Sequence, residues 1–274
     1  MKTFILKTGA WSHGLSILLA STLLYLGVIA SPQGWLAFPT VLLTLAGGLM
    51  PMLMTIVFIK MDWFDDNLTL KRFFSDKFSL SKPSFKGWTW VVAILLMGAL
   101  VPVFIHWMMH GDIRLFKGGP LLFLPIGFFI GGLEEVGWRG FFLEKLEKRH
   151  TPFTASLFVG VIWMLWHWPL FFITGTYQQG LGLFTAEGIV FHLSILFGTF
   201  LYTFLYHKTR YSVLAVMIYH GTGNVLGEIL IDAEPWVGLG VTVVLSLAII
   251  AFDKDMFFHG QRKKERTAIR RPHP

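Results

Sequence analysis

The chain has 274 residues, of which 54% are hydrophobic and only 14% are charged, and its mean hydropathy is +0.61. Soluble domains rarely have this composition, so we expect an integral membrane protein. Cysteine is absent, which excludes a cysteine nucleophile, a disulfide framework and cysteine-ligated metal sites. The net charge of +7 does not indicate a nucleic-acid partner, because the basic residues lie at the ends of apolar runs, as in membrane proteins.

Apolar runs long enough to cross a membrane recur along the whole chain. A helix needs about 20 mostly apolar residues to span the hydrocarbon region, where every backbone group must be hydrogen-bonded within the protein. The predicted fold is therefore all-α, a polytopic transmembrane helical bundle that forms one domain over residues 1–274. We place about eight spans, at residues 13–30, 35–59, 88–109, 121–143, 154–173, 188–206, 213–231 and 236–252.

The first span admits a second interpretation. It follows Lys2 and Lys7, as the core of a secretory signal peptide would. Its apolar run is longer than the roughly 7 to 15 residues of a signal core, so a permanent span is the preferred interpretation.

The distribution of basic residues predicts the orientation of the protein. With the N-terminus inside, the outer segments hold only Arg114 and Lys117, so the positive-inside rule places both termini in the cytoplasm. The inner loop at 61–87 mixes aromatic residues with lysines and aspartates, which is typical of a helix on the membrane surface but also of a solvated linker. Within the cytoplasmic tail at 253–274, the basic stretch 261–271 is expected to be disordered and attracted to anionic lipid.

Ionisable residues inside the span at 121–143 are functional candidates. Placing a charge in hydrocarbon costs about 2.5 to 3.5 kcal/mol even on the lenient insertion scale. Glu135 and Arg139 are four residues apart, so they share a helical face and can form an ion pair. Glu134 points about 100° away from Glu135 and needs another partner.

Two histidines on other spans are predicted at a similar depth. They are His167 in the span at 154–173 and His220 in the span at 213–231. Asn224 follows His220 by one turn and shares its face, and Trp163 has the same relation to His167. Nearby glycines leave room for another helix to approach His220 closely: Gly221, Gly223 and Gly227. Interfacial or packing roles are the simpler explanation for polar residues near span ends: His106, His110, His192 and Glu228.

This set of residues fits the hydrolysis of an acyl compound, most naturally a peptide bond. A carboxylate beside an imidazole is a general base for water, and an imidazole with an amide can donate hydrogen bonds to an oxyanion. A catalytic zinc is one alternative, with Glu134, His167 and His220 as ligands, although the chain contains no H-E-x-x-H motif. A purely structural role for these residues is the other alternative, and their number at one depth on three helices argues against it.

Three motifs resemble those of a known family. They are E-E-x-x-x-R at Glu134 to Arg139, aromatic-x-x-x-H at Trp163 to His167 and H-x-x-x-N at His220 to Asn224. In this order on separate helices, they are similar to the motifs of the CAAX prenyl protease and bacteriocin-processing (CPBP, Abi-like) family of intramembrane endopeptidases. The resemblance covers residues of about 121–231, the expected catalytic core. The second motif of the family usually begins with Phe, where this chain has Trp163.

The resemblance implies a membrane-embedded peptidase that acts on a lipidated or membrane-associated protein or peptide. Glu134 would activate water with His167 beside it. His220 and Asn224 would bind the oxyanion. The supporting residues would be Glu135, Arg139 and Trp163. The family is commonly described as metalloproteases, but its residues also support a metal-free mechanism, which we prefer, with Zn²⁺ as the alternative.

Two further functions stay open. A family member without activity would act as a bacteriocin-immunity protein or a membrane scaffold. A proton-coupled transporter would use the charges of the span at 121–143 as a relay, but no duplicated half is visible in the sequence. The expected location is the plasma membrane of a prokaryote, with the lipid bilayer and the lipidated or membrane-associated substrate as partners.

Overall fold

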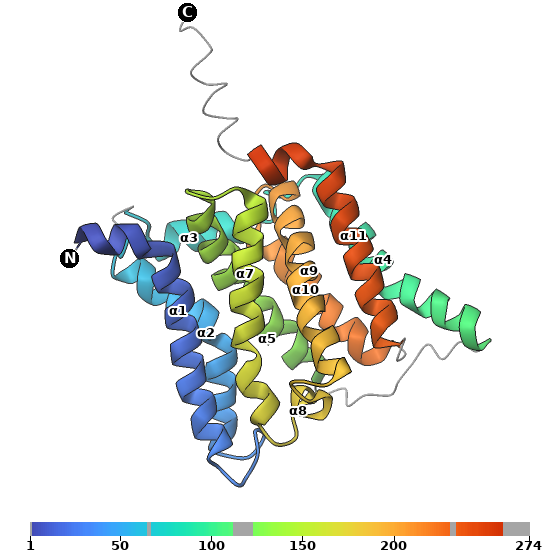
Figure 1. The fold of residues 1–274 in the computed structure, drawn as a ribbon. Helices are drawn as coiled ribbons and strands as arrows, with labels where there is room; N and C mark the ends of the chain where they lie inside the picture. The colour runs from blue at the N-terminus through green and yellow to red at the C-terminus, as the bar shows by residue number, and fades with distance from the viewer. Residues whose placement is uncertain (1, 65–66, 112–122, 231–233, 260–274) are drawn as a thin grey trace, which may run out of the picture.

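The computed structural model describes residues 2–64, 67–111, 123–230 and 234–259 (Figure 1). Within these ranges every regular element is a helix, as predicted. The long helices are α1 (Lys2–Ile29), α2 (Thr40–Lys60), α4 (Phe85–His110), α7 (Pro152–Trp166), α9 (Ala186–Lys208), α10 (Val213–Ile229) and α11 (Pro235–Phe252). The shorter ones are α3 (Leu70–Lys77), α5 (Phe123–Gly137), the π-helical segment η1 (Trp138–Leu143), α6 (Glu144–Glu147), the 3-10 segment η2 (Trp168–Phe172) and α8 (Tyr177–Leu181).

Among the described residues, six helical segments are long and apolar enough to cross a membrane, which makes the chain a multi-pass integral membrane protein. They are Gly9–Ile29, Thr40–Lys60, Phe85–His110, Pro152–Phe172, Ala186–Lys208 and Pro235–Phe252. The other two predicted spans are also helical, but α5 has 15 residues before the π-helical segment and α10 has 17. Whether these two helices cross the membrane stays a prediction.

The described ends of the bundle lie on one side. In Figure 1, α1 begins and α11 ends at the upper end of the bundle. An even number of crossings requires this arrangement, whereas the cytoplasmic location of the termini stays a prediction. α1 packs along α2, and its residues Ile17 and Tyr25 are buried. The predicted disordered stretch at 261–271 lies outside the described residues.

The loop at 61–87 contains a helix, as the first interpretation of this loop predicted. Thr69 caps α3 by accepting a hydrogen bond from the backbone N–H of Arg72 at 3.2 Å. Phe73 is buried, and its ring centre lies 6.4 Å from that of Phe141 in η1. Lys77 forms an ion pair with Glu144. One face of α3 therefore packs on the bundle, and its location at a membrane surface stays a prediction.

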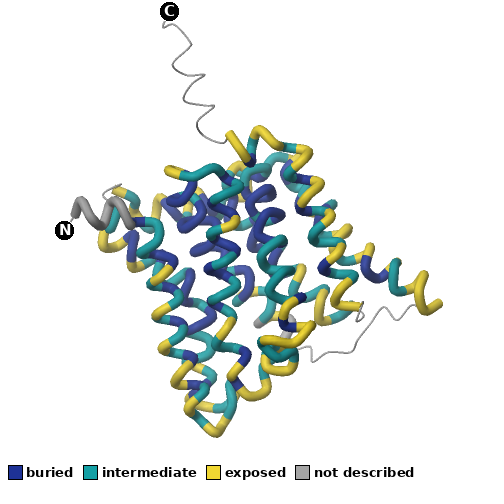
Figure 2. Tube along the Cα trace, in the orientation of Figure 1, coloured by how far each residue is buried: buried dark blue, intermediate teal, exposed yellow. Residues whose placement is uncertain are grey.

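Glycines allow α5 to approach both α2 and α10 closely in the middle of the bundle, where Figure 2 shows most of the buried positions. A Cβ at Gly137 would lie 2.4 Å from the carbonyl oxygen of Pro51 in α2. A Cβ at Gly221 of α10 would lie 2.5 Å from the carbonyl oxygen of Phe128 in α5. The expectation for Gly223 and Gly227 is not met within the described residues, because no described atom lies within 4 Å of a Cβ at either position.

Candidate active site

Glu135 and Arg139 form the buried ion pair that their spacing predicts. Nη1 of Arg139 donates to both carboxylate oxygens of Glu135, at 3.0 and 2.9 Å, and both side chains are 0% exposed. Arg139 lies in η1, all of whose residues are buried. A π-helical turn of this kind often marks a functional site.

His220 binds the same carboxylate from α10. Its Nδ1 lies 2.8 Å from Oε1 of Glu135. An ionised carboxylate only accepts hydrogen bonds, so this contact assigns a proton to Nδ1. Ser212 starts α10 by accepting a hydrogen bond from the backbone N–H of Ala215 at 3.2 Å. That cap fixes the start of α10 and therefore the position of His220 along the helix axis.

Asn224 and His220 meet beside Gly131 of α5. A Cβ at Gly131 would lie 2.2 Å from Nδ2 of Asn224 and 3.3 Å from Nε2 of His220. The two nitrogen atoms therefore face the same small volume, as expected for residues one turn apart. Nδ2 of Asn224 also donates to the carbonyl oxygen of Gly127 at 3.0 Å, which leaves its second N–H for another acceptor.

Glu134 has the separate partner that its direction requires. The indole Nε1 of Trp163 in α7 donates to Oε2 of Glu134 at 2.8 Å. Glu134 is 6% exposed and Trp163 is 4% exposed, so the bond is sheltered from solvent. A neutral donor on a desolvated carboxylate makes a charge-assisted hydrogen bond, which is stronger than one between neutral groups.

His167 follows the last residue of α7. Its Nδ1 lies 2.8 Å from the carbonyl oxygen of Trp163, and a carbonyl oxygen only accepts, so Nδ1 carries the proton. In the neutral ring, Nε2 is then an acceptor that can take a proton from water. The start of α7 is defined by Pro152 at its first position and by Thr151, which accepts from the backbone N–H of Thr154 at 3.3 Å.

Two aromatic rings enclose Arg139. Its guanidinium carbon lies 4.5 Å from the ring centre of Trp163 and 4.2 Å from that of Tyr202 in α9. Tyr202 also packs edge-on against His220, with ring centres 5.3 Å apart. The sequence interpretation missed Tyr202, because a single tyrosine in an apolar helix carries no charge and matches none of the three motifs.

Among the polar residues assigned to span ends, His192 interacts electrostatically with His167. These residues are Glu228, His106, His110 and His192, and Glu228 is exposed. The rings of His106 and His110 lie 4.5 Å apart, and that of His192 stacks on Phe171 at 5.1 Å.

Each of the three side chains considered as zinc ligands makes a hydrogen bond to a different partner. Glu134 is bonded to the indole of Trp163, His167 to the carbonyl oxygen of Trp163, and His220 to Glu135. Among the described residues, no group of three His, Asp or Glu side chains is arranged to hold a metal ion. Zn²⁺ binding by Glu134, His167 and His220 stays the alternative prediction.

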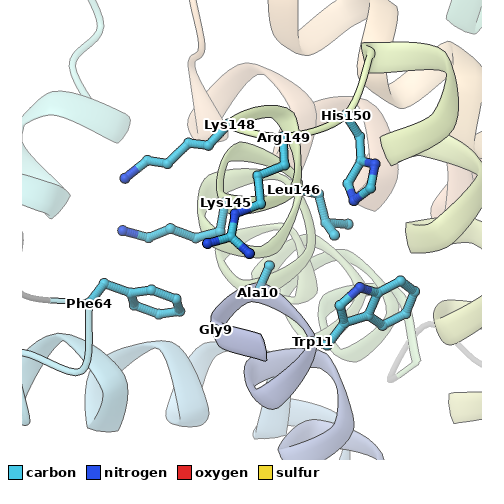
Figure 3. Close-up of a pocket in the computed structure, with 9 residues that line it drawn as sticks. All are labelled: Gly9, Ala10, Trp11, Phe64, Lys145, Leu146, Lys148, Arg149 and His150. Carbon is cyan, nitrogen blue, oxygen red and sulfur yellow. The ribbon is translucent and has the colours of Figure 1, made fainter. Parts of the chain in front are cut away.

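A cavity of about 180 Å³ lies elsewhere in the molecule (Figure 3). It is lined by Gly9, Ala10, Trp11, Phe64, Lys145, Leu146, Lys148, Arg149 and His150. None of the predicted site residues lines it, so this cavity is separate from the candidate active site.

Comparisons with known proteins agree with the motifs. Residues 116–226 match the family model described as type II CAAX prenyl endopeptidase Rce1-like. The chain is also 30% identical, over 275 residues, to CAAX prenyl protease 2 of the archaeon Methanococcus maripaludis, with 94% of each chain covered. The region matched by the family model contains all three motifs.

Proposed function

This chain belongs to the family of Rce1-like type II CAAX prenyl endopeptidases, and we propose that it cleaves a peptide bond within the membrane. The substrate is a lipidated or membrane-associated protein or peptide. The observation that carries the proposal is the buried polar cluster built from α5, η1, α7 and α10, since charges at such depth are costly and usually serve function. Its buried members are Glu134, Glu135, Arg139 and His220, and the half-buried His167 and Asn224 complete the set.

In the first step of the proposed reaction, Glu134 takes a proton from a water molecule. Trp163 holds one carboxylate oxygen of Glu134. His167 offers its unprotonated Nε2 as a second acceptor for the same water, because its Nδ1 proton is engaged by a backbone carbonyl. The water oxygen then bonds to the carbonyl carbon of the scissile peptide.

Hydrogen bonds from His220 and Asn224 stabilise the oxyanion formed in this step. Asn224 has one N–H beyond the bond to Gly127. His220 uses its Nδ1 proton on Glu135, so it donates from Nε2 as an imidazolium ion. The charges of Glu134 and Glu135 are then balanced by those of Arg139 and His220. A neutral cluster is the least costly one to bury.

The tetrahedral intermediate collapses when the carbon–nitrogen bond breaks. The proton held by Glu134 moves to the leaving amine nitrogen, and the carbonyl carbon becomes that of a carboxylic acid. Glu134 returns to its ionised form. Every proton is transferred by residues of this chain, so we propose a metal-free reaction. We also propose that the protein lies in the plasma membrane of a prokaryote.

The test is cleavage of a quenched fluorescent, prenylated peptide by the purified protein in liposomes. Glu134→Gln keeps the size of the side chain and removes its basicity, so cleavage is expected to fall about 100- to 10,000-fold. Glu228→Gln makes the same chemical change at an exposed position of α10 and is expected to retain the full rate.

Two results would contradict the proposal. Cleavage by Glu134→Gln at the wild-type rate would remove Glu134 as the base. A stable wild-type protein that cleaves no lipidated or membrane-associated peptide would favour the scaffold alternative.

A further inference from the structure

Trp163 contacts each part of the candidate site. Its indole N–H donates to Glu134 at 2.8 Å, and its backbone carbonyl accepts from His167 at 2.8 Å. Its ring centre lies 4.5 Å from the guanidinium carbon of Arg139 and 5.5 Å from the ring centre of His220. One residue of α7 thus connects the groups on the water side of the proposed reaction with those on the oxyanion side.

These contacts leave the indole of Trp163 little freedom to rotate. Its ring packs edge-on against Tyr202, with centres 5.3 Å apart, while Arg139 lies over its face. A donor fixed in this way determines the direction of the carboxylate it binds. Because the indole binds Oε2 of Glu134, the carboxylate is held in one orientation, and its remaining lone pairs can accept a proton from water.

We infer that Trp163 is a positioning residue whose indole N–H holds the Glu134 carboxylate in the orientation that activates water. The inference rests on the proposed function. It differs from a packing role of the ring, because it assigns the effect on rate to a single N–H group. A fixed catalytic geometry contributes to the rate of the chemical step more than to substrate binding.

Trp166 provides a matched control on the same helix. It is 3% exposed, compared with 4% for Trp163, and its indole N–H also makes a 2.8 Å hydrogen bond, to the hydroxyl of Ser21. That bond joins α7 to α1 and involves none of the motif residues. The two tryptophans therefore have similar burial and hydrogen bonding, and differ in the partner of the N–H group.

The experiment replaces each tryptophan in turn by benzothienylalanine, in which sulfur takes the place of the indole N–H and the ring size is kept. At position 163, kcat for the prenylated peptide is expected to fall about 10- to 100-fold, the range for losing a hydrogen bond to a charged group. KM is expected to stay within about twofold. At position 166, both constants are expected to match those of the wild type. Thermal melting in detergent reports any loss of fold.

A double variant tests whether Trp163 acts through Glu134. In the Glu134→Gln background, the benzothienylalanine change at 163 is expected to cause no further loss of the residual rate. A wild-type kcat at 163, an equal loss at 166, or a change confined to KM would overturn the inference. If Glu134→Gln itself cleaves normally, the proposed function fails first, so the two failures are distinguishable.

Discussion

The guanidinium carbon of Arg139 in η1 lies 4.2 Å from the ring centre of Tyr202 in α9. Nη1 is the nitrogen that binds Glu135, whereas Nε and Nη2 are buried without a hydrogen-bond partner in the described residues. The aromatic face of Tyr202 compensates in part for these missing hydrogen bonds, because a desolvated cation over a ring gains about 2 kcal/mol. Tyr202 thereby helps keep the arginine in place beside Glu135.

We predict that Tyr202→Leu lowers both stability and cleavage, while Tyr202→Phe changes little. Leucine removes the ring that stabilises the Arg139 cation, at a cost of about 2 kcal/mol, whereas phenylalanine keeps it. Thermal melting in detergent and the cleavage rate measure the two effects. Equal behaviour of the two variants would show that the ring does not stabilise Arg139.

Gly131→Ala is expected to reduce cleavage about 100-fold, the order of loss from a displacement of about 1 Å at a reacting centre. The new Cβ would lie 2.2 Å from Nδ2 of Asn224 and would push the amide away. Gly127→Ala is the control, one turn earlier on α5, where the Cβ meets that of Asn224 at an ordinary 3.7 Å. A normal rate in Gly131→Ala would place the oxyanion donors elsewhere.

Arg139→Leu is expected to destabilise the protein by about 3 to 5 kcal/mol, because it removes one of the two cations bound to Glu135 and leaves the buried cluster with an unbalanced negative charge. Adding Glu135→Gln to this variant removes the unpaired charge and is expected to restore part of the stability. Cleavage is not expected to return, since glutamine provides no charge to stabilise the His220 imidazolium. Thermal inactivation and cleavage of both variants provide the measurement. Recovered activity in the double variant would show that the ion pair serves packing alone.

The proposed mechanism predicts cleavage that resists chelators. In that mechanism Glu134 is the base for water, and His167 and His220 each carry a proton on Nδ1 through their hydrogen bonds, so no step requires a metal ion. Metal analysis of the purified protein, run alongside cleavage with and without chelator, tests this. Stoichiometric zinc with chelator-sensitive cleavage would replace the proposed roles of these residues by metal ligation.

Labelling of single cysteines tests the orientation, and the chain suits it because it contains no native cysteine. Lys82→Cys and Lys254→Cys are expected to react with an impermeant maleimide only after the cytoplasmic side is opened. Gly111→Cys and Gly175→Cys are expected to react from outside in intact cells. The reverse pattern would contradict the positive-inside assignment.

The sequence by itself determined the helical membrane class, the family motifs and the Glu135–Arg139 pair. These depend on composition and on spacing along one helix, which the 3.6-residue turn converts directly into geometry. It also showed that Glu134 needs a partner from elsewhere in the chain. The number of membrane spans does not follow from the sequence alone, because α10 has only 17 residues and α5 continues as a π-helical segment.

Only the tertiary structure decided which residues from different helices meet. It placed the indole N–H of Trp163 on Glu134, the Tyr202 ring on Arg139, and His220 with Asn224 against Gly131. Such contacts depend on how closely two helices pack and how each is rotated about its axis. In this protein glycines set that distance between α5 and its neighbours, and buried hydrogen bonds set the rotation, neither of which is readable from the spacing within one helix.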